Sequence, residues 1–300
     1  MLPYLKLIKF DNLLIIALAQ FCIKYGLFEP FNIAITLNGI GITMLVVATV
    51  SIAAAGNIII EIYDREDSGA KSLLQGSITE KSANRLFIVF NIIGVLIGFY
   101  LANLISRPGF AALFIIISVV YYIYASYLKE IIAVKNIVIA LLAALSLIVV
   151  GIFDLLPAIT EKNRASQTVI FSIITDYAIF AFIIVILREL VKDCLTIDKD
   201  HNVGIRTVPI VLGKSRTTKL IGVLTLLPIA AVIYYIYTYL FSNSKAVILV
   251  LALVVAPLLY FMIKSFSAES DKQFIHLRLI LKLVLVIASI SLLLYQFVLI

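Results

Sequence analysis

The chain has 300 residues, of which 63% are hydrophobic and 14% are charged, and its formal net charge is +7. Soluble domains contain roughly 45–50% apolar and about 25% charged residues, so this composition excludes a water-soluble globule. It also excludes a disordered chain, which needs low hydrophobicity. The composition predicts an all-α integral membrane protein, because helices satisfy their own backbone hydrogen bonds in lipid.

Nine segments are long and apolar enough for a spanning helix, which needs about 20 residues. In chain order, the predicted spans are 11–28, 38–62, 86–105, 109–128, 132–153, 167–191, 218–241, 245–264 and 277–299. The third and fourth are separated only by Ser106-Arg107-Pro108, which predicts a tight, helix-breaking turn. We therefore expect residues 1–300 to form a single transmembrane domain.

Basic residues are distributed unevenly about these spans. Of the 24 Lys and Arg residues, 19 lie on the N-terminal side and 5 on the opposite side. The positive-inside rule then predicts an N-terminus in the cytoplasm. We expect the chain to lie in the cell (inner) membrane. Since the positive charge follows membrane topology in this way, it does not indicate a nucleic-acid partner.

Carboxylates gather in two segments on the same predicted cytoplasmic side. The first segment follows the second span and the second follows the sixth; their acids are Glu61, Asp64, Glu66, Asp67 and Glu80, then Glu189, Asp193, Asp198 and Asp200. Carboxylates beside fixed cations are typical of a site for Mg²⁺ that carries a phosphorylated ligand. The alternative is that these charges only solvate helix ends.

The spacing within each segment supports the first interpretation. If the second helix continues through Asp67, then Asn57, Glu61 and Asp64 lie on one of its faces. Asp193 and Asp200 are seven residues apart and share a face if their segment is helical. Separately, Asp176 falls in the middle of the sixth span, where an ionisable side chain indicates either a functional role or a hydrogen bond to a neighbouring helix.

Two stretches carry a resemblance to a known family. AGNIIIEIYDRED (55–67), followed by KSLLQGSIT (71–79), and RELVKDCLTIDKDHNVGIRTVPIVLG (188–213) resemble the Asp-rich motifs of the UbiA superfamily of membrane prenyltransferases. YASYLKEIIAVKNIVIA (124–140) is similar to a weaker family pattern between the fourth and fifth helices. The chain looks most like the geranylgeranylglycerol-phosphate geranylgeranyltransferase branch.

The resemblance implies a nine-helix bundle around a central cavity, in which Mg²⁺ holds a polyprenyl diphosphate. Departure of the diphosphate would leave an allylic carbocation, which a lipophilic acceptor captures. The favoured acceptor is geranylgeranylglyceryl phosphate, and an aromatic quinone precursor is the alternative. Membrane lipids surround the bundle, and no obligate protein partner is expected.

Individual roles follow from the resemblance and the spacing together. The expected metal ligands are Glu61, Asp64, Asp67, Asp193 and Asp200. Of these, Asp64, Asp193 and Asp200 are the expected catalytic residues. The expected substrate-binding residues are Asn57, Arg65, Lys71, Lys129, Asp176, Arg188 and Lys192.

The sequence departs from the family pattern at two motif positions. Ile60 stands where the family has Asn, and Thr196 stands where it has Asp. These replacements favour another hypothesis, a relative that binds prenyl lipids without chemistry. A secondary transporter, with the acids as ion-coupling sites, is a third hypothesis, but only Asp176 has the midspan depth that it requires.

Overall fold

The computed structural model describes residues 2–68, 78–202 and 204–298, and over these residues it contains helices and no strand. The α-helices are α1 (Leu2–Leu7), α2 (Phe10–Cys22), α3 (Gly39–Ser68), α4 (Glu80–Leu104), α5 (Ala111–Ser126), α6 (Val134–Val150), α7 (Arg164–Leu195), α8 (Ile197–Asn202), α9 (Val208–Leu212), α10 (Lys214–Leu224), α11 (Leu226–Tyr235), α12 (Ser244–Val250), α13 (Ala256–Phe266) and α14 (Asp271–Val298). Short 3₁₀ segments are η2 (Pro108–Phe110), η3 (Leu128–Glu130) and η5 (Leu156–Ala158).

Four spanning helices contain a π-helical turn. These turns are η1 (Ile23–Phe28), η4 (Gly151–Leu155), η6 (Ile236–Leu240) and η7 (Leu251–Val255). A π-helical turn accommodates extra residues within a helix and changes which side chains face its neighbours, often at functional sites. Two of these turns contain oppositely charged residues, Lys24 in η1 and Asp154 in η4.

The nine predicted spans are confirmed within the described part of the chain. Its apolar helices cover Phe10–Phe28, Gly39–Asp64, Glu80–Leu104, Pro108–Ser126, Val134–Ala158, Arg164–Leu195, Lys214–Leu240, Ser244–Ser265 and Asp271–Leu293. The third begins six residues earlier than predicted, because Thr79 caps α4 by accepting a hydrogen bond from the Ser82 backbone N–H at 3.3 Å. Polar first turns of this kind are invisible to a hydropathy window.

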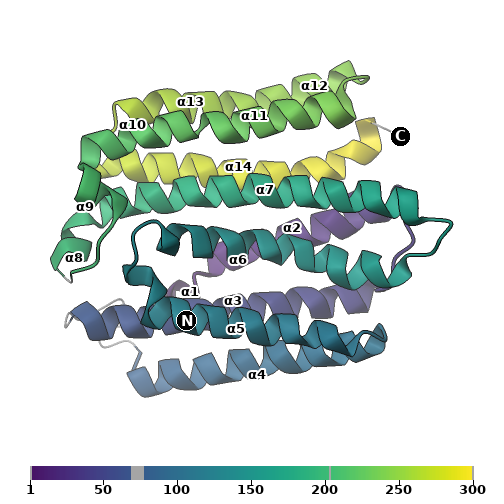
Figure 1. Ribbon diagram of the computed structural model, residues 1–300, viewed down its shortest axis with the longest axis horizontal. Coiled ribbons are helices and arrows are strands. Elements are labelled where there is room, and N and C mark those ends of the chain that lie inside the picture. Colours follow the sequence, from purple (N-terminus) through teal and green to yellow (C-terminus); the bar gives the residue numbers. More distant parts are fainter. Residues whose placement is uncertain (1, 69–77, 203, 299–300) are drawn as a thin grey trace.

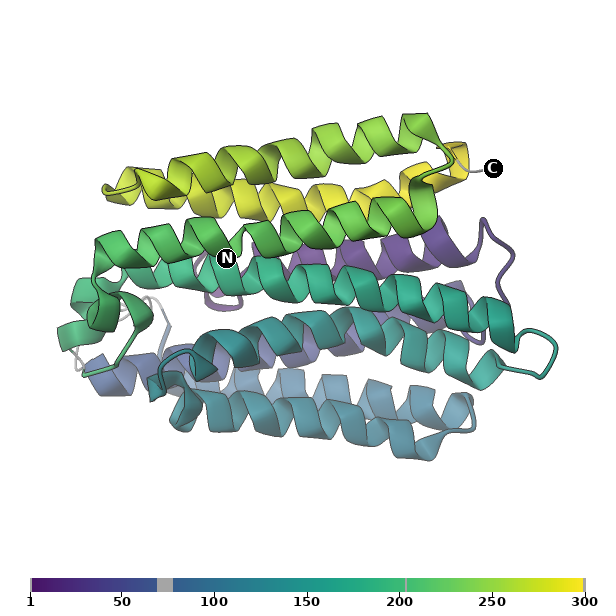
Figure 2. The ribbon, with the colours of Figure 1, turned by 45° about the horizontal axis from the view of Figure 1, so that its top comes forward.

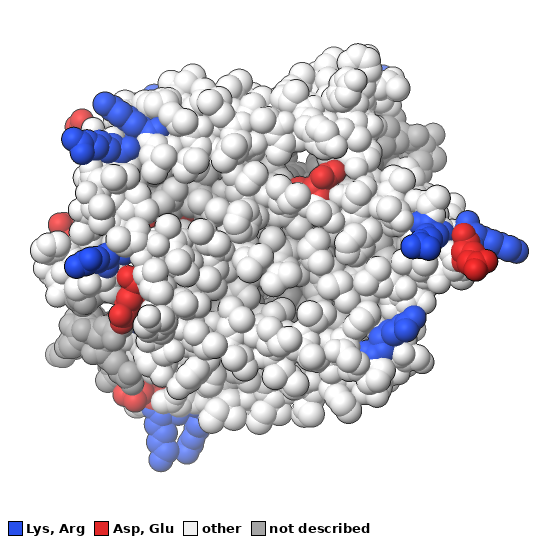
Figure 3. Space-filling view, viewed as in Figure 1, with Lys and Arg blue, Asp and Glu red and all other residues white. Residues whose placement is uncertain are grey.

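The helices lie roughly side by side, so that their connections gather at two ends (Figures 1 and 2). We name them the motif end, which contains residues 127–133 and 196–202, and the far end, which contains residues 29–38 and 159–163. Charged side chains on the face in Figure 3 lie mostly at these ends, with an apolar band between them. This distribution suits helices whose middles contact lipid.

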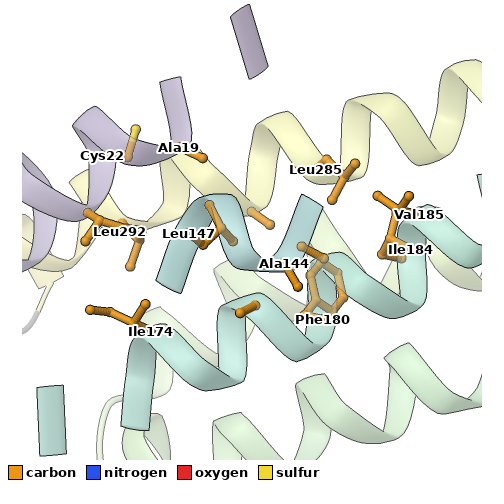
Figure 4. Close-up of a cluster of buried hydrophobic side chains, with 14 of the residues drawn as sticks. Ala19, Cys22, Ala144, Leu147, Ile174, Phe180, Ile184, Val185, Leu285 and Leu292 are labelled. Carbon is orange, nitrogen blue, oxygen red and sulfur yellow. The ribbon is translucent and has the colours of Figure 1, made fainter. Parts of the chain in front are cut away.

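The centre of the bundle is formed where α2, α6, α7 and α14 meet. Figure 4 shows Leu147 of α6 and Leu292 of α14 among the side chains that converge there, together with Ile184 of α7. The η1 segment approaches α14 so closely that a Cβ on Gly26 would lie 2.7 Å from the Leu292 carbonyl carbon. A glycine is required at this crossing, and the close packing fixes the first span against the last.

Candidate functional site

A cavity of about 220 Å³ lies between α2, α3, α5, α6, α7 and α14. Most of its wall is apolar and includes Ile16, Ile52, Phe114, Leu147 and Leu285. The charged part of its lining comes from the helix ends nearest the motif end. The cavity can therefore accept a molecule with a long apolar portion and a charged head.

Cations dominate the mouth of this cavity. Its charged lining residues are Lys9, Arg188, Lys192, Arg278 and one acid, Glu189. The Lys192 ammonium lies 2.9 Å from Glu189 Oε2, and Arg188 donates to Asn12 Oδ1 at 3.2 Å. The Nε atoms of Arg188 and Arg278 are buried without a hydrogen-bond partner among the described residues. Since buried donors normally have a partner, these two nitrogens are candidates for donating to an acceptor in the cavity.

Lys9 connects this mouth to both acidic segments. It lies between α1 and α2 with a left-handed φ of 51°. Desolvation by burial lowers the pKa of Lys9 below its usual range, and the charge of Lys192 lowers it further. Glu189, Asp64 and Glu61 act in the opposite direction, so Lys9 lies within electrostatic range of carboxylates from α3 and α7.

The first acidic segment forms the last turns of α3. The Lys129 ammonium, from η3, lies 3.0 Å from Asp64 Oδ1, and Glu61 lies one turn earlier on α3. Asn57 lines the cavity and donates to the Ile8 carbonyl oxygen at 2.9 Å. The helix continues through Asp67, which is the condition under which Asn57, Glu61 and Asp64 share one of its faces. Of the remaining predicted residues, the side chains of Arg65 and Asp67 and all of Lys71 lie outside the described residues.

The second acidic segment is organised around a lysine that the sequence analysis did not single out. The Lys135 ammonium lies 2.7 Å from Asp193 Oδ1 and 3.7 Å from Asp200 Oδ2. The Asn136 amide donates to Asp193 Oδ2 at 3.1 Å, and the Thr196 hydroxyl donates to Asp200 Oδ2 at 2.8 Å. Lys135 therefore bridges two carboxylates at the start of α6.

The helical register expected for this second segment is not observed. The segment is not one helix, because α7 ends at Leu195 and α8 begins at Ile197. Asp193 and Asp200 therefore do not share a helix face. They come together through Lys135, and their role as metal ligands stays a prediction.

The structure brings both acidic segments to the motif end. Lys129 and Lys135 belong to the same short connection between α5 and α6, and they bind one segment each. Tyr124 of α5 lies within electrostatic range of Asp64 and of Asp193. Sequence reasoning did not single out Lys9, Asn12, Lys135 or Arg278. It also did not predict the hydrogen bond from Asn136 to Asp193. The signal available for Lys9 and Lys135 was their position beside predicted span ends.

Asp176 lies elsewhere. It lines a second cavity, of about 210 Å³, with Tyr177, Tyr235 and Ser291 from α7, α11 and α14. Its Oδ2 atom is buried without a hydrogen-bond partner among the described residues. The structure therefore does not group Asp176 with Lys192 and Arg188, and its role in substrate binding stays a prediction.

The two acidic segments differ in their suitability for Mg²⁺. Mg²⁺ commonly uses one or two protein carboxylates and takes its remaining ligands from phosphate and water. Glu61 and Asp64 lie one turn apart on α3, with the Lys129 ammonium 3.0 Å from Asp64 Oδ1, and this pair can supply one or two carboxylates. Asp193 and Asp200 differ from this pair in that a single ammonium group, that of Lys135, lies within ion-pair distance of both carboxylates. Over the described residues, no group of three or more His, Cys, Asp or Glu side chains forms an all-protein metal site.

Comparison with known proteins gives a consistent result. The family model of the UbiA prenyltransferase family matches residues 13–297. The chain is 29% identical over 219 residues to a digeranylgeranylglyceryl phosphate synthase of Sulfolobus acidocaldarius, covering 71% of this chain and 70% of that one. It is 26% identical over 208 residues to a digeranylgeranylglyceryl phosphate synthase of Korarchaeum cryptofilum, covering 67% of this chain. The match spans 66% of the Korarchaeum protein, just under two thirds of its length.

Solved structures share the fold at lower identity. A UbiA homolog from Aeropyrum pernix K1 has a TM-score of 0.70 at 13% identity, covering 94% of this chain and 97% of that one. A UbiA homolog from Archaeoglobus fulgidus, bound to DMAPP and Mg²⁺, has a TM-score of 0.61 at 15% identity, covering 97% and 98%. These similarities extend over nearly the whole bundle.

Proposed function

The chain belongs to the UbiA prenyltransferase family, and on this premise we propose that it transfers a geranylgeranyl group from its diphosphate to the hydroxyl of geranylgeranylglyceryl phosphate. Two relatives named digeranylgeranylglyceryl phosphate synthase support this acceptor. The Archaeoglobus homolog bound to DMAPP and Mg²⁺ supports an isoprenyl diphosphate donor and a magnesium cofactor.

The observation that carries the proposal is the division of the cavity into an apolar interior and a cationic mouth. Among the described residues, the cavity mouth is lined by one carboxylate, Glu189, and by four cations, Lys9, Arg188, Lys192 and Arg278. Both proposed substrates have a phosphate-bearing head and a long isoprenoid tail. A phosphorylated acceptor would offer oxygens to the buried Nε atoms of Arg188 and Arg278 in addition to those of the diphosphate donor.

The proposed chemistry uses this division. The bond between the allylic carbon and the diphosphate oxygen breaks, and its electron pair leaves with the diphosphate. A new bond forms from that carbon to the acceptor oxygen, whose proton is released. Lys9, Arg188 and Lys192 would offset the charge on the departing diphosphate. The apolar wall would exclude water that otherwise captures the carbocation.

Magnesium has a defined place in this proposal. When bound, Mg²⁺ supplies further stabilisation of the leaving diphosphate as a Lewis acid. Glu61 and Asp64 would hold it, and Asp67, Arg65 and Lys71 remain predicted contributors. Lys129, which lies 3.0 Å from Asp64 Oδ1, would contact the diphosphate or orient that carboxylate.

The charge distribution also supports an orientation. We place the motif end on the cytoplasmic side of the cell membrane, because 19 of the 24 Lys and Arg residues flank the spans there. The substrates would then reach the cavity from the cytoplasmic leaflet.

A reconstitution experiment tests the proposal. The purified full-length chain is incubated with radiolabelled geranylgeranyl diphosphate, Mg²⁺ and either geranylgeranylglyceryl phosphate or an aromatic quinone precursor. We expect diphosphate release and a labelled diether product with the phosphorylated acceptor alone. Prenylation of the aromatic acceptor would replace the proposed substrate by its rival. Tight binding without diphosphate release from either mixture would support the non-catalytic lipid binder, which the lysine-bridged second segment favours.

A further inference from the structure

The most unusual group at the motif end is the bridge that Lys135 forms between Asp193 and Asp200. Both acids were expected to bind metal, yet a single ammonium group already contacts both, at 2.7 Å and 3.7 Å. The bridge is also sheltered from solvent, with side-chain exposures of 11% for Lys135 and 1% for Asp193. Carboxylates buried to this degree need a cation within the structure.

Neighbouring donors complete the bridge. Asn136, next to Lys135 on α6, donates to the second oxygen of Asp193, and Thr196 donates to Asp200 Oδ2. Asp193 thus has one oxygen facing an ammonium and the other facing an amide. Lys192 adds a second positive charge near Asp193. Both oxygens of Asp193 and one oxygen of Asp200 therefore face donors, which come from α6 and from Thr196 at the C-cap of α7.

An ammonium and a divalent cation cannot share this position. Two like charges a few ångströms apart in a poorly solvated site repel strongly. Lys135 also begins a long, packed helix, and the residue before Val134 has a left-handed φ of 62°, so the backbone that carries the lysine is set by its own turn. Entry of a metal would require the lysine to leave both of its partners.

We propose that Lys135 takes the place of a metal ion at the second acidic segment, so that this chain binds one divalent cation, at Glu61 and Asp64, with its diphosphate substrate. The inference rests on the proposed function for the first metal, and it assigns Asp193 and Asp200 to holding Lys135. In this arrangement Lys135 supplies the cationic charge at the second acidic segment, and this charge does not depend on the metal concentration.

Counting bound Mn²⁺ tests this inference without turnover. The detergent-solubilised full-length chain is titrated with Mn²⁺ in the presence of geranylgeranyl thiodiphosphate, and free Mn²⁺ is followed by electron paramagnetic resonance. We expect one Mn²⁺ per chain for the wild type and two for Lys135→Ala. Lys135→Arg keeps the charge and should bind one. Lys214→Ala, which removes a lysine from the separate pair with Asp271 at the same end, is the matched control and should also bind one.

A thermal measurement covers the case in which Lys135→Ala is unstable. Without metal this variant leaves two carboxylates unpaired, so it should melt below the wild type, and added Mn²⁺ should raise its melting temperature more than that of the wild type. Lys135→Gln provides a second neutral variant with the same expectation.

The possible outcomes separate the two proposals. Two ions in the wild type, or one ion in every variant, would overturn the inference even if prenyl transfer is active. One ion in the wild type and two in Lys135→Ala would support it even if no transfer is detected. Binding of no ion by any variant would overturn the magnesium part of the proposed function and this inference with it.

Discussion

The bundle contains buried lysine–aspartate groups at both ends, and they differ in how completely their polar atoms are paired. At the far end, Lys24 of η1 lies 2.8 Å from Asp154 of η4, with side-chain exposures of 1% and 0%. Lys24 also donates to the Leu37 carbonyl oxygen. Asp154 Oδ1 accepts from the Thr36 and Leu37 backbone N–H groups at 2.9 and 2.7 Å.

The motif end contrasts with this complete pairing. There the buried Nε atoms of Arg188 and Arg278 lack a partner within the described chain, and Lys9 is held where burial lowers its pKa. Since unsatisfied buried donors are unfavourable, these two arginines favour an acceptor that enters the cavity. The comparison teaches that the charged pair at the far end is satisfied within the bundle, whereas the two arginines at the cavity mouth keep a donor that a ligand can use.

The largest expected effect comes from breaking the paired end. Asp154→Ala would leave Lys24 as an isolated buried cation, which destabilises a fold by about 3–5 kcal/mol. Unfolding in mixed detergent micelles with SDS measures this change. The double variant Lys24→Met, Asp154→Leu removes both charges and should lose less stability than Asp154→Ala. An equal or greater loss would contradict the view that the unpaired charge is the cause.

A smaller effect, on turnover and not on folding, is expected at the motif end. Asp64→Asn keeps the shape of the side chain but removes the proposed Mg²⁺ ligand, so prenyl transfer should fall by about 100-fold or more. Steady-state kinetics with labelled geranylgeranyl diphosphate measures it. Asp11→Asn, which breaks an exposed pair with Lys282 at the same end, is the control and should retain turnover. Equal activity in the two variants would remove Asp64 from the site.

An intermediate loss of affinity is expected from the unpartnered arginine. Arg188→Gln removes a cation and a donor from the cavity mouth, so the KM for the phosphorylated acceptor should rise by about 10-fold, which corresponds to about 1.4 kcal/mol. The exposed Arg206, changed to Gln, serves as the comparison. If both variants gave the wild-type KM, the unpartnered Nε of Arg188 would have no ligand role.

The smallest expected effect is a pH dependence that sharpens the role of Lys9. Its protonated form attracts the phosphate head, and its pKa is lowered by burial and by Lys192. Affinity should therefore be full at neutral pH and weaken by a few-fold as the pH rises through that lowered pKa, before an ordinary lysine deprotonates. Lys9→Arg should abolish this weakening, since arginine stays protonated. A pH-independent KM in the wild type would argue against contact between Lys9 and the substrate.

Hydropathy and charge were sufficient to predict the nine spans and the grouping of both acidic segments at one end. The pairing between spans was not predictable in this way. Lys24 and Asp154 are 130 residues apart in the sequence, and Lys135 of α6 contacts Asp193 of α7. Neither pair could therefore be found from spacing within one helix. Lys24 within an apolar span was a usable signal, because a charge there implies a partner.

The second acidic segment shows a different limit of sequence reasoning. Counting seven residues from Asp193 to Asp200 assumes an unbroken helix, but the chain turns at Thr196. Thr196 was treated only as a missing acid, whereas its hydroxyl donates to Asp200. The residue that stands in place of the motif acid is therefore a hydrogen-bond partner of Asp200, which the sequence alone does not show.

The fifth span links the two ends that have been compared. Its single helical rod runs from Lys135 to Asp154, about 28 Å at 1.5 Å per residue, close to the roughly 30 Å hydrocarbon thickness of a bilayer. An ion pair at each end of this helix, Lys135–Asp193 and Lys24–Asp154, fixes its rotation about its own axis, so neither end can rotate independently. Deleting one residue between the two anchors would rotate them apart by about 100°. A change in this helix near one membrane surface would thereby displace the side chains at the other surface.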